Sequence, residues 1–184
     1  MADGGSRIAI FGAGYVGLVT GACFADLGHE VAIRDIVPGR IDALRRGEVP
    51  IYEPGLAELL ERNRERLRFT TDVAEALAGA DFVYVAVGTP PTPSGDADLS
   101  AVWTVVDELP EGTDAIVVMK STVPVGTGEK VGEALRARGL DGAGYVSNPE
   151  FTAEGSAVRD FMQPDRIVIG ASRAEDGDAV ERLH

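Results

Sequence analysis

Cysteine and histidine are scarce in this sequence of 184 residues. The chain contains one cysteine, Cys23, and two histidines, His29 and His184. A single cysteine excludes a disulfide within the chain, and so few thiol and imidazole groups argue against a metal centre. We therefore expect no bound metal.

Long apolar runs and an excess of basic charge are also missing. No apolar segment approaches the roughly 20 residues of a membrane span, and residues 1–6 lack the basic and apolar regions of a signal peptide. We therefore expect a cytoplasmic protein with no membrane segment. The formal net charge of −13 would repel phosphates over most of the surface, which argues against nucleic acid as a partner. An anionic ligand can bind only where local backbone donors outweigh this charge.

Aromatic residues are few as well, at 6% of the chain, whereas 45% of the residues are hydrophobic. An aliphatic core of this kind is typical of α/β proteins. Short apolar runs alternate with helical stretches, which indicates βαβ units. The predicted strands are residues 7–11, 31–35, 67–70, 82–87, 115–120, 145–147 and 166–170. The predicted helices are residues 15–27, 38–46, 54–64, 72–78, 99–108 and 126–138. We expect a Rossmann-type fold, a doubly wound, mostly parallel sheet with helices on both faces.

The last eleven residues, 174–184, predict the opening of a further helix that stops before it is complete. No repeat or low-complexity tail precedes it. We therefore expect residues 1–184 to form one nucleotide-binding domain cut from a longer protein.

A glycine motif follows the first predicted strand. The residues are Gly12-Ala13-Gly14-Tyr15-Val16-Gly17. In such a motif Gly12 permits a tight turn, Gly14 lets the backbone approach a pyrophosphate, and Gly17 allows close packing of helix on strand. The N–H groups at the start of the following helix then bind the phosphates.

An acidic residue ends the second predicted strand. Asp35 follows Gly17 by 18 residues, close to the ~20 expected for the acid that binds the ribose 2′-hydroxyl. A carboxylate there would repel a 2′-phosphate, so the pair predicts NAD rather than NADP. Arg34 and Arg40 flank Asp35 and could weaken this preference. The alternative is a structural glycine turn with an exposed Asp35.

Further segments accompany the glycine motif in a particular order. They are Pro50-Ile51-Tyr52-Glu53-Pro54-Gly55-Leu56, Val87-Gly88-Thr89-Pro90, Lys120-Ser121-Thr122-Val123-Pro124-Val125-Gly126-Thr127, Ser147-Asn148-Pro149-Glu150-Phe151 with Glu154-Gly155, and Pro164-Asp165-Arg166-Ile167-Val168-Ile169-Gly170. In order and spacing the chain resembles the N-terminal NAD-binding domain of the UDP-glucose/GDP-mannose dehydrogenase family over nearly its whole length. Residues 120–126 and 164–166 look most like the UDP-glucose 6-dehydrogenase branch; a GDP-mannose or other nucleotide-sugar enzyme is the alternative.

The resemblance implies a reaction and a set of site residues. Such enzymes oxidise a sugar C6 alcohol to a carboxylate and pass two hydrides to two NAD molecules. The resemblance places these residues along the cofactor: Gly12, Gly14, Tyr15, Val16, Gly17, Asp35, Arg40, Thr89, Thr122 and Glu154. It also implies that Thr122 and Glu154 position a water, and that Glu150 takes part in acid/base work or shapes the substrate site. Hydrolysis of an acyl intermediate needs such an oriented water and a carboxylate.

Each of these acids also has a purely structural alternative, because a glutamate near a helix N-terminus often only compensates the helix dipole. If helical, Glu150 and Glu154 would share a face, but Pro149 indicates that Glu150 precedes any helix. The family usually has leucine where this chain has Thr152, which puts the local substrate packing in question.

Some parts of the family site fall outside this sequence. The family's cysteine nucleophile, and a lysine and an asparagine of its central helical domain, would lie beyond His184, as would the C-terminal UDP-binding domain. Cys23 cannot substitute, because it should be buried on the first helix. We therefore expect the chain to bind NAD without turning over UDP-glucose. The family resemblance also implies a homodimer for the full-length protein, while the chain alone could be monomeric.

Other interpretations stay open at this point. The chain could be a free-standing NAD-binding or redox-sensing module without chemistry. Another Rossmann enzyme, such as a methyltransferase or a hydroxyacid dehydrogenase, would leave Thr122 and residues 150–154 unexplained. We interpret residues 52–55 as a turn leading into a helix. Lys120 could face a phosphate or simply be exposed, and Asp165-Arg166 should form a turn before a strand.

Overall fold

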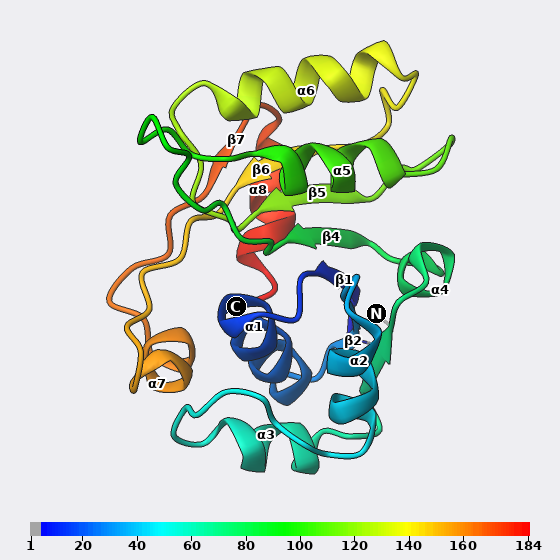
Figure 1. Ribbon diagram of the computed structural model, residues 1–184. Coiled ribbons are helices and arrows are strands. Elements are labelled where there is room, and N and C mark those ends of the chain that lie inside the picture. The colour runs from blue at the N-terminus through cyan, green and yellow to red at the C-terminus, as the bar shows by residue number, and fades with distance from the viewer. Residues whose placement is uncertain (1–4) are drawn as a thin grey trace.

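Seven strands form one sheet in the computed structural model, which describes residues 5–184 (Figure 1). The strands follow the order β3-β2-β1-β4-β5-β6-β7. Their bounds are β1 Arg7–Phe11, β2 Glu30–Arg34, β3 Leu67–Thr70, β4 Phe82–Val85, β5 Ile116–Met119, β6 Tyr145–Ser147 and β7 Gly170–Ala171. Strands β1 to β6 pair in parallel and β7 pairs antiparallel with β6. This order confirms the predicted Rossmann-type fold.

Helices cover both faces of the sheet, because each parallel crossover returns over a face (Figure 1). Alternate residues of β1 show the division: Ile8 and Ile10 pack into one core layer, and Ala9 and Phe11 into the other. The first layer receives α1 (Tyr15–Asp26), α2 (Pro38–Arg45), α3 (Leu56–Arg62), α7 (Ala157–Met162) and α8 (Ala174–Glu181). The second receives α4 (Val73–Leu77), α5 (Ser100–Glu108) and α6 (Thr127–Ala137).

The segment after residue 162 departs from the prediction. A strand over residues 166–170 is wrong, because β7 begins only at Gly170. Ile167 and Val168 are 38% and 41% exposed. The carbonyl of Val168 accepts a hydrogen bond from the side chain of Asn148 at 3.0 Å, in place of a strand ladder. The apolar residues of this segment therefore predicted a strand, whereas the segment is irregular and is held by the side chain of Asn148.

Two short helices also differ from the prediction. Helix α7 has six residues and was not predicted. Helix α8 begins at the expected residue but ends at Glu181. The N–H groups of Leu183 and His184 then bond to the carbonyls of Val180 and Glu181, which closes the last turn.

The described residues also bear on the membrane and metal predictions. Within residues 5–184, no helix combines the length and the apolar character that crossing a bilayer requires. In the same range, no group of three or more His, Cys, Asp or Glu side chains could hold a metal ion. Residues 1–4, on which part of the signal-peptide prediction rests, lie outside the described residues.

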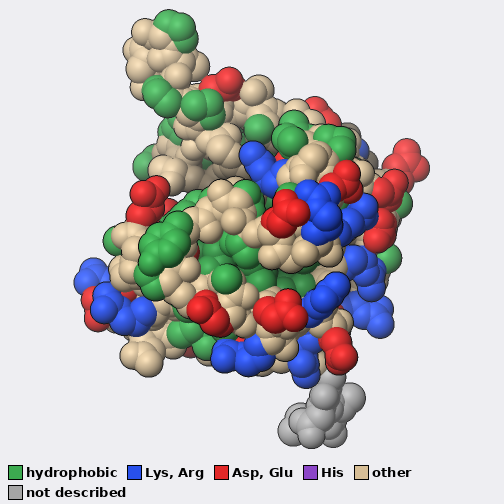
Figure 2. Space-filling view, turned by 60° about the horizontal axis from the view of Figure 1, so that its bottom comes forward, with side chains coloured by type: hydrophobic (Ala, Val, Ile, Leu, Met, Phe, Trp, Pro, Cys, Tyr) green, Lys and Arg blue, Asp and Glu red, His purple; other side chains and the backbone are tan. Residues whose placement is uncertain are grey.

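Charged side chains of both signs are interspersed on the face drawn in Figure 2, around a patch of hydrophobic side chains. Basic charge is therefore not gathered into one patch on that face. The predicted cofactor loops follow the strands at the carboxyl edge of the sheet. The chain order reverses between β1 and β4, and ligands of doubly wound sheets bind in the crevice at such a switch point.

Candidate cofactor and substrate site

The three motif glycines occupy different environments. Gly12 has φ +111°, and a Cβ added there would lie 2.4 Å from the carbonyl oxygen of Ala86. A Cβ on Gly17 would lie 1.8 Å from the carbonyl oxygen of Gly12. A Cβ on Gly14 would meet no atom within 4 Å, because Gly14 faces open space. Gly12 and Gly17 are therefore required by packing, and Gly14 leaves room for a ligand beside the backbone.

Asp35 lies against the glycine loop and is 6% exposed. Its Oδ2 accepts hydrogen bonds from the N–H of Ala13 and from Arg40 Nη1, both at 2.8 Å. Its Oδ1 accepts one from the N–H of Val37 at 2.9 Å, which leaves acceptor capacity on that oxygen. Asp35 is therefore not the exposed residue that the alternative required, whereas its contact with a ribose stays a prediction.

Arg34 is directed away from Asp35, although the two are neighbours in sequence. Its guanidinium donates to both carboxylate oxygens of Glu108, at 2.8 and 3.0 Å, and lies 5.4 Å from the ring centroid of Phe11. Of the two flanking arginines, Arg40 is therefore the one that contacts the acid.

Two cavities meet at Gly14. The first has a volume of 290 Å³ and is lined by Gly12, Gly14, Arg34, Asp35, Ile36, Val37, Arg40, Ala86, Val87, Gly88, Ala101, Thr104 and Val105. The second has a volume of 240 Å³ and is lined by Gly14, Tyr15, Val16, Ala86, Val87, Gly88, Thr89, Lys120, Ser121, Thr122 and Glu150. An extended ligand can therefore pass Gly14, with one end beside Asp35 and the other beside Thr122. These residues fit a dinucleotide, because the acid suits a ribose and the glycine loop suits a pyrophosphate.

The second cavity gathers half of the predicted cofactor residues. It contains Tyr15 and Val16 from the start of α1, Thr89 from the loop after β4, and Thr122 from the loop after β5. The hydroxyl of Thr89 donates to the carbonyl of Thr122 at 2.8 Å and so ties two of these loops together. The structure thus brings these four residues to one place.

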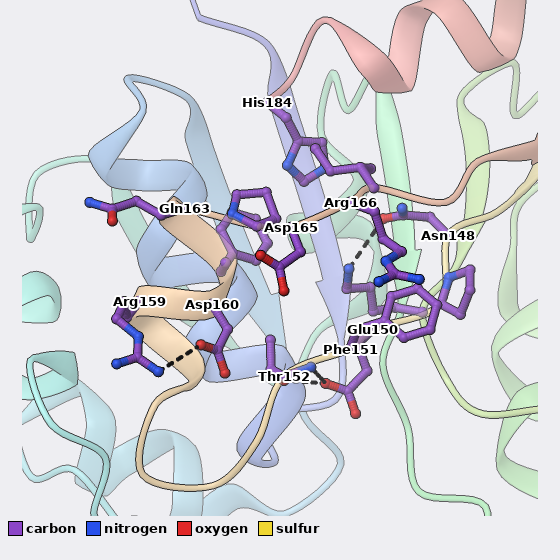
Figure 3. Close-up of a pocket in the computed structure, with 15 residues that line it drawn as sticks. Asn148, Glu150, Phe151, Thr152, Arg159, Asp160, Gln163, Asp165, Arg166 and His184 are labelled. Carbon is purple, nitrogen blue, oxygen red and sulfur yellow. Dashed lines mark hydrogen bonds and ion pairs between the residues drawn. The ribbon is translucent and has the colours of Figure 1, made fainter.

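A third cavity, of 690 Å³, adjoins the second (Figure 3). It is lined by Lys120, Asn148, Pro149, Glu150, Phe151, Thr152, Arg159, Asp160, Phe161, Gln163, Pro164, Asp165, Arg166, Ile167 and His184. Residues of α7 form one side, and Asn148, Glu150 and Arg166 lie across from them (Figure 3). Lys120 and Glu150 line both this cavity and the second one.

Lys120 is buried at this junction, so of its two interpretations the one of an exposed side chain is wrong. It is 6% exposed, and its Nζ lies 3.2 Å from Asn148 Oδ1 and 5.7 Å from the ring centroid of Phe161. Burial lowers the pKa of Lys120 to about 8, although the negative charge of Glu150 opposes the shift. The spacing of residues 120–127 gave no sign of this, because the partners lie far along the chain.

Glu150 precedes any helix, as Pro149 predicted, and its carboxylate is held locally. The hydroxyl of Thr152 donates to Glu150 Oε2, and the N–H of Thr152 lies 3.4 Å from the same oxygen. The residue that departs from the family's leucine therefore fixes the direction of this acid (Figure 3).

Glu154 occupies a different environment. It lies in the turn before α7, is exposed, and lines none of the three cavities. No helix carries both Glu150 and Glu154, so the shared helical face does not exist. The structure does not bring Glu154 to Thr122, and the positioning of a water by this pair stays a prediction.

Glu53 is a residue whose contacts the sequence did not reveal. It is 5% exposed, whereas its neighbour Tyr52 is 91% exposed. Glu53 Oε2 accepts hydrogen bonds from the hydroxyl of Tyr15 and, at 2.7 Å, from the N–H of Gly155. The interpretation of residues 52–55 as a turn is right for the backbone but misses the buried carboxylate.

Cys23 is fully buried on α1, as predicted. Burial is the main cause that raises the pKa of its thiol to about 12, and the negative charges of Asp26 and Glu53 add to the effect. A thiol with this pKa is protonated near neutral pH and is a poor nucleophile.

Sheet order, glycine loop and buried acid together define a Rossmann-type dinucleotide-binding domain. Residues 6–184 match the model of the UDP-glucose/GDP-mannose dehydrogenase family, NAD binding domain. The chain belongs to this family and is its NAD-binding domain.

Named relatives cover nearly the whole chain. It is 47% identical to a UDP-glucose 6-dehydrogenase of Pseudomonas aeruginosa, over 97% of this chain and 41% of that protein. It is 48% identical to one of Rhizobium meliloti, over 95% of this chain and 41% of that protein. The chain thus spans about two fifths of the length of these relatives.

Solved structures agree with the sequence relatives. A UDP-glucose dehydrogenase of Pyrobaculum islandicum matches with a TM-score of 0.90 and 40% identity, over 100% of this chain and 45% of that chain. A ternary complex of GDP-mannose dehydrogenase from Pseudomonas aeruginosa matches with a TM-score of 0.91 and 36% identity, over 96% of this chain and 43% of that chain.

Proposed function

We propose that this chain is the NAD-binding part of an enzyme that oxidises the C6 alcohol of UDP-glucose to UDP-glucuronate with two NAD. Relatives named UDP-glucose 6-dehydrogenase, 47% and 48% identical to this chain, support that substrate. The alternative is the oxidation of GDP-mannose or another UDP-sugar, because a GDP-mannose dehydrogenase has nearly the same fold. One observation carries the proposal: Lys120 and Glu150 line both the second cavity and the large third cavity.

The cofactor half of the proposal rests on backbone donors and one acid. Bound NAD supplies a hydride acceptor. The N–H groups at the start of α1 would bind its pyrophosphate, helped by the positive end of the helix dipole. Asp35 Oδ1 would accept from the ribose, while Gly14 leaves room for the phosphates. Local donors of this kind let a chain of net charge −13 hold an anionic cofactor.

The substrate half rests on the buried junction between the two cavities. A sugar nucleotide in the third cavity would bring its sugar to Glu150 and Lys120, next to Thr122. Glu150, held by Thr152, would exchange a proton with the reacting groups. The proposed role of Glu154 beside Thr122 requires the Glu154 side chain to turn toward Thr122, because it is exposed here and lines none of the three cavities. Cys23 would take no part, because it is buried away from these cavities.

Calorimetric titration of the 184-residue chain tests the cofactor assignment. We expect binding of NAD, at least about tenfold weaker binding of NADP, and far weaker binding of UDP-glucose. Equal or tighter binding of NADP would contradict the role of Asp35. Tight UDP-glucose binding would contradict the expectation that the sugar-nucleotide site is mostly supplied from outside this chain.

An activity assay of the protein encoded by the complete gene tests the reaction. We expect two NADH per UDP-glucose, and none from the 184-residue chain alone. Preferential turnover of GDP-mannose or another UDP-sugar would establish the alternative substrate. An NAD-binding module without chemistry would give no NADH with any nucleotide sugar. A cytoplasmic location and a full-length homodimer stay predictions, which fractionation and sedimentation would check.

A further inference from the structure

Glu53 is a buried carboxylate, and none of the salt bridges found within residues 5–184 includes it. Among the contacts of residues 5–184, its two hydrogen-bond donors are the hydroxyl of Tyr15 and the N–H of Gly155, and both reach Oε2. Oε1 is buried and makes no hydrogen bond of ordinary geometry within that range. A buried carboxylate without an ion pair is costly, so its presence calls for a physical reason.

The surroundings of Glu53 offer donors. Burial raises the pKa of Glu53, but its two hydrogen bonds and the nearby backbone N–H groups of Val158 and Ala157 lower it more strongly, so that the pKa lies below its ordinary value. An ionised carboxylate accepts at both oxygens, whereas an amide must present an NH₂ group to one side. A glutamine with its carbonyl oxygen at the Oε2 position could keep both donors, but it would lose the negative charge that strengthens these contacts.

The two partners of Glu53 belong to different parts of the site. Tyr15 begins α1 directly after Gly14 and lines the second cavity. Gly155 closes the loop 150–155, which carries Glu150 at the junction of the second and third cavities. Tyr15 also lies 3.4 Å from the carbonyl oxygen of Ala153, in the same loop. Glu53 is separated by 102 residues from Gly155, so the contact exists only in the folded chain.

We propose that Glu53 is a positioning residue that binds Tyr15 and Gly155 to one carboxylate oxygen and thereby sets the loop 150–155 against the nicotinamide end of the cofactor site. Its effect on the cofactor rests on NAD binding by this domain. Its effect on the placement of Glu150 rests on the proposed function. Glu53 contacts neither cavity itself, so it acts through Tyr15 and the loop.

Titration of Glu53→Gln with two ligands tests the proposal. NAD occupies both ends of the site, whereas ADP carries only the adenosine and pyrophosphate end. We expect NAD binding about tenfold weaker and ADP binding within about twofold of the unchanged chain, because the two contacts that hold the nicotinamide end lose the charge of their shared acceptor. Glu58→Gln is the matched control, since it makes the same charge change at an exposed position five residues away. Unchanged NAD binding, or an equal loss for NAD and ADP, would overturn the proposal.

Hydrogen exchange gives a readout that needs no ligand. In Glu53→Gln, we expect faster exchange of the amides of residues 150–156 and unchanged exchange in β1, because a single anchor is lost rather than the fold. Tyr15→Phe removes only the phenol oxygen and should give a smaller change in the same loop, and it serves if Glu53→Gln fails to fold. Uniform acceleration over the chain, or none in the loop, would contradict the proposal.

These measurements involve no sugar nucleotide, so they separate two kinds of failure. If the complete protein does not oxidise UDP-glucose but the difference between NAD and ADP persists, the proposed function is wrong and the role of Glu53 stands. If UDP-glucose is oxidised but Glu53→Gln binds NAD and exchanges like the unchanged chain, the role of Glu53 is wrong.

Discussion

The glycine side and the lysine side of the site are built by different means. The glycine side, Gly12 to Gly17 with Asp35, is made of backbone turns that leave room for a ligand. The lysine side, Lys120 with Asn148 and Glu150, is made of side chains that are buried or half-buried and hold one another in place. Both sides lie at the carboxyl ends of strands in the same sheet.

The two sides therefore differ in the free-energy cost of forming them. On the glycine side, any added atom at Gly12 or Gly17 collides with backbone, so the sequence there is limited by space. On the lysine side, the cost is desolvation of charge, shown by the pKa of Lys120 at about 8. Substitutions of Gly12 or Gly17 should therefore change stability through packing. Substitution of Lys120 should change how stability depends on pH.

The largest effect should come from Gly17→Ala. Its Cβ would lie 1.8 Å from a backbone oxygen that cannot move without shifting the glycine loop. We expect the free energy of unfolding to fall by about 3 kcal/mol in urea denaturation. Gly14→Ala is the matched control, because its Cβ meets open space and should change stability by about 0.5 kcal/mol or less. Gly14→Ala should nevertheless weaken NAD binding by at least about tenfold, since that space is needed by the ligand. If Gly17→Ala and Gly14→Ala were equally stable, the claim that packing limits Gly17 but not Gly14 would be contradicted.

Lys120 should make the stability of the protein depend on pH. Folding lowers its pKa from 10.5 to about 8, so the unfolded chain binds more protons between these two values. Stability should therefore rise with pH across that window, while the full cost of burying the charge persists below pH 8. Lys120→Met removes this term, and the difference in unfolding free energy between the variant and the unchanged chain should shift by about 2 kcal/mol from pH 7 to pH 9.5.

A parallel series with Lys130→Met controls for the loss of a lysine elsewhere, because Lys130 is exposed on α6. Urea denaturation at several pH values gives the comparison. If the Lys120 and Lys130 variants show the same pH dependence, the burial of Lys120 carries no such cost.

A smaller effect should follow from Asp35→Asn. The amide keeps the size of the side chain but loses the charge that would repel a 2′-phosphate. We expect NAD binding to weaken by about tenfold and the preference for NAD over NADP to narrow, because Arg40 is freed from its ion pair. Calorimetric titration with both cofactors measures the ratio. An unchanged ratio would show that selectivity lies outside the glycine side.

Much of the fold could be predicted because it depends on local patterns. The strands of residues 7–11, 67–70 and 145–147 have their predicted bounds, and Asp72 caps α4 by accepting from the N–H of Glu75 at 2.7 Å. The strand of residues 166–170 was wrong and α7 was missed. Around residue 168 the backbone is held by the side chain of Asn148, and no periodicity records such a contact.

The sequence by itself determined the Rossmann-type sheet, the glycine loop and the acid at the end of the second strand, because turns, packing and strand periodicity act over a few residues. Only the tertiary structure decided that Lys120 is buried, that Glu154 lies outside the cavities, and that Glu53 joins Tyr15 to Gly155. These outcomes depend on which segments, distant in sequence, pack against one another in the fold. Burial and hydrogen bonding between such segments arise only from that packing, so local sequence patterns do not predict them.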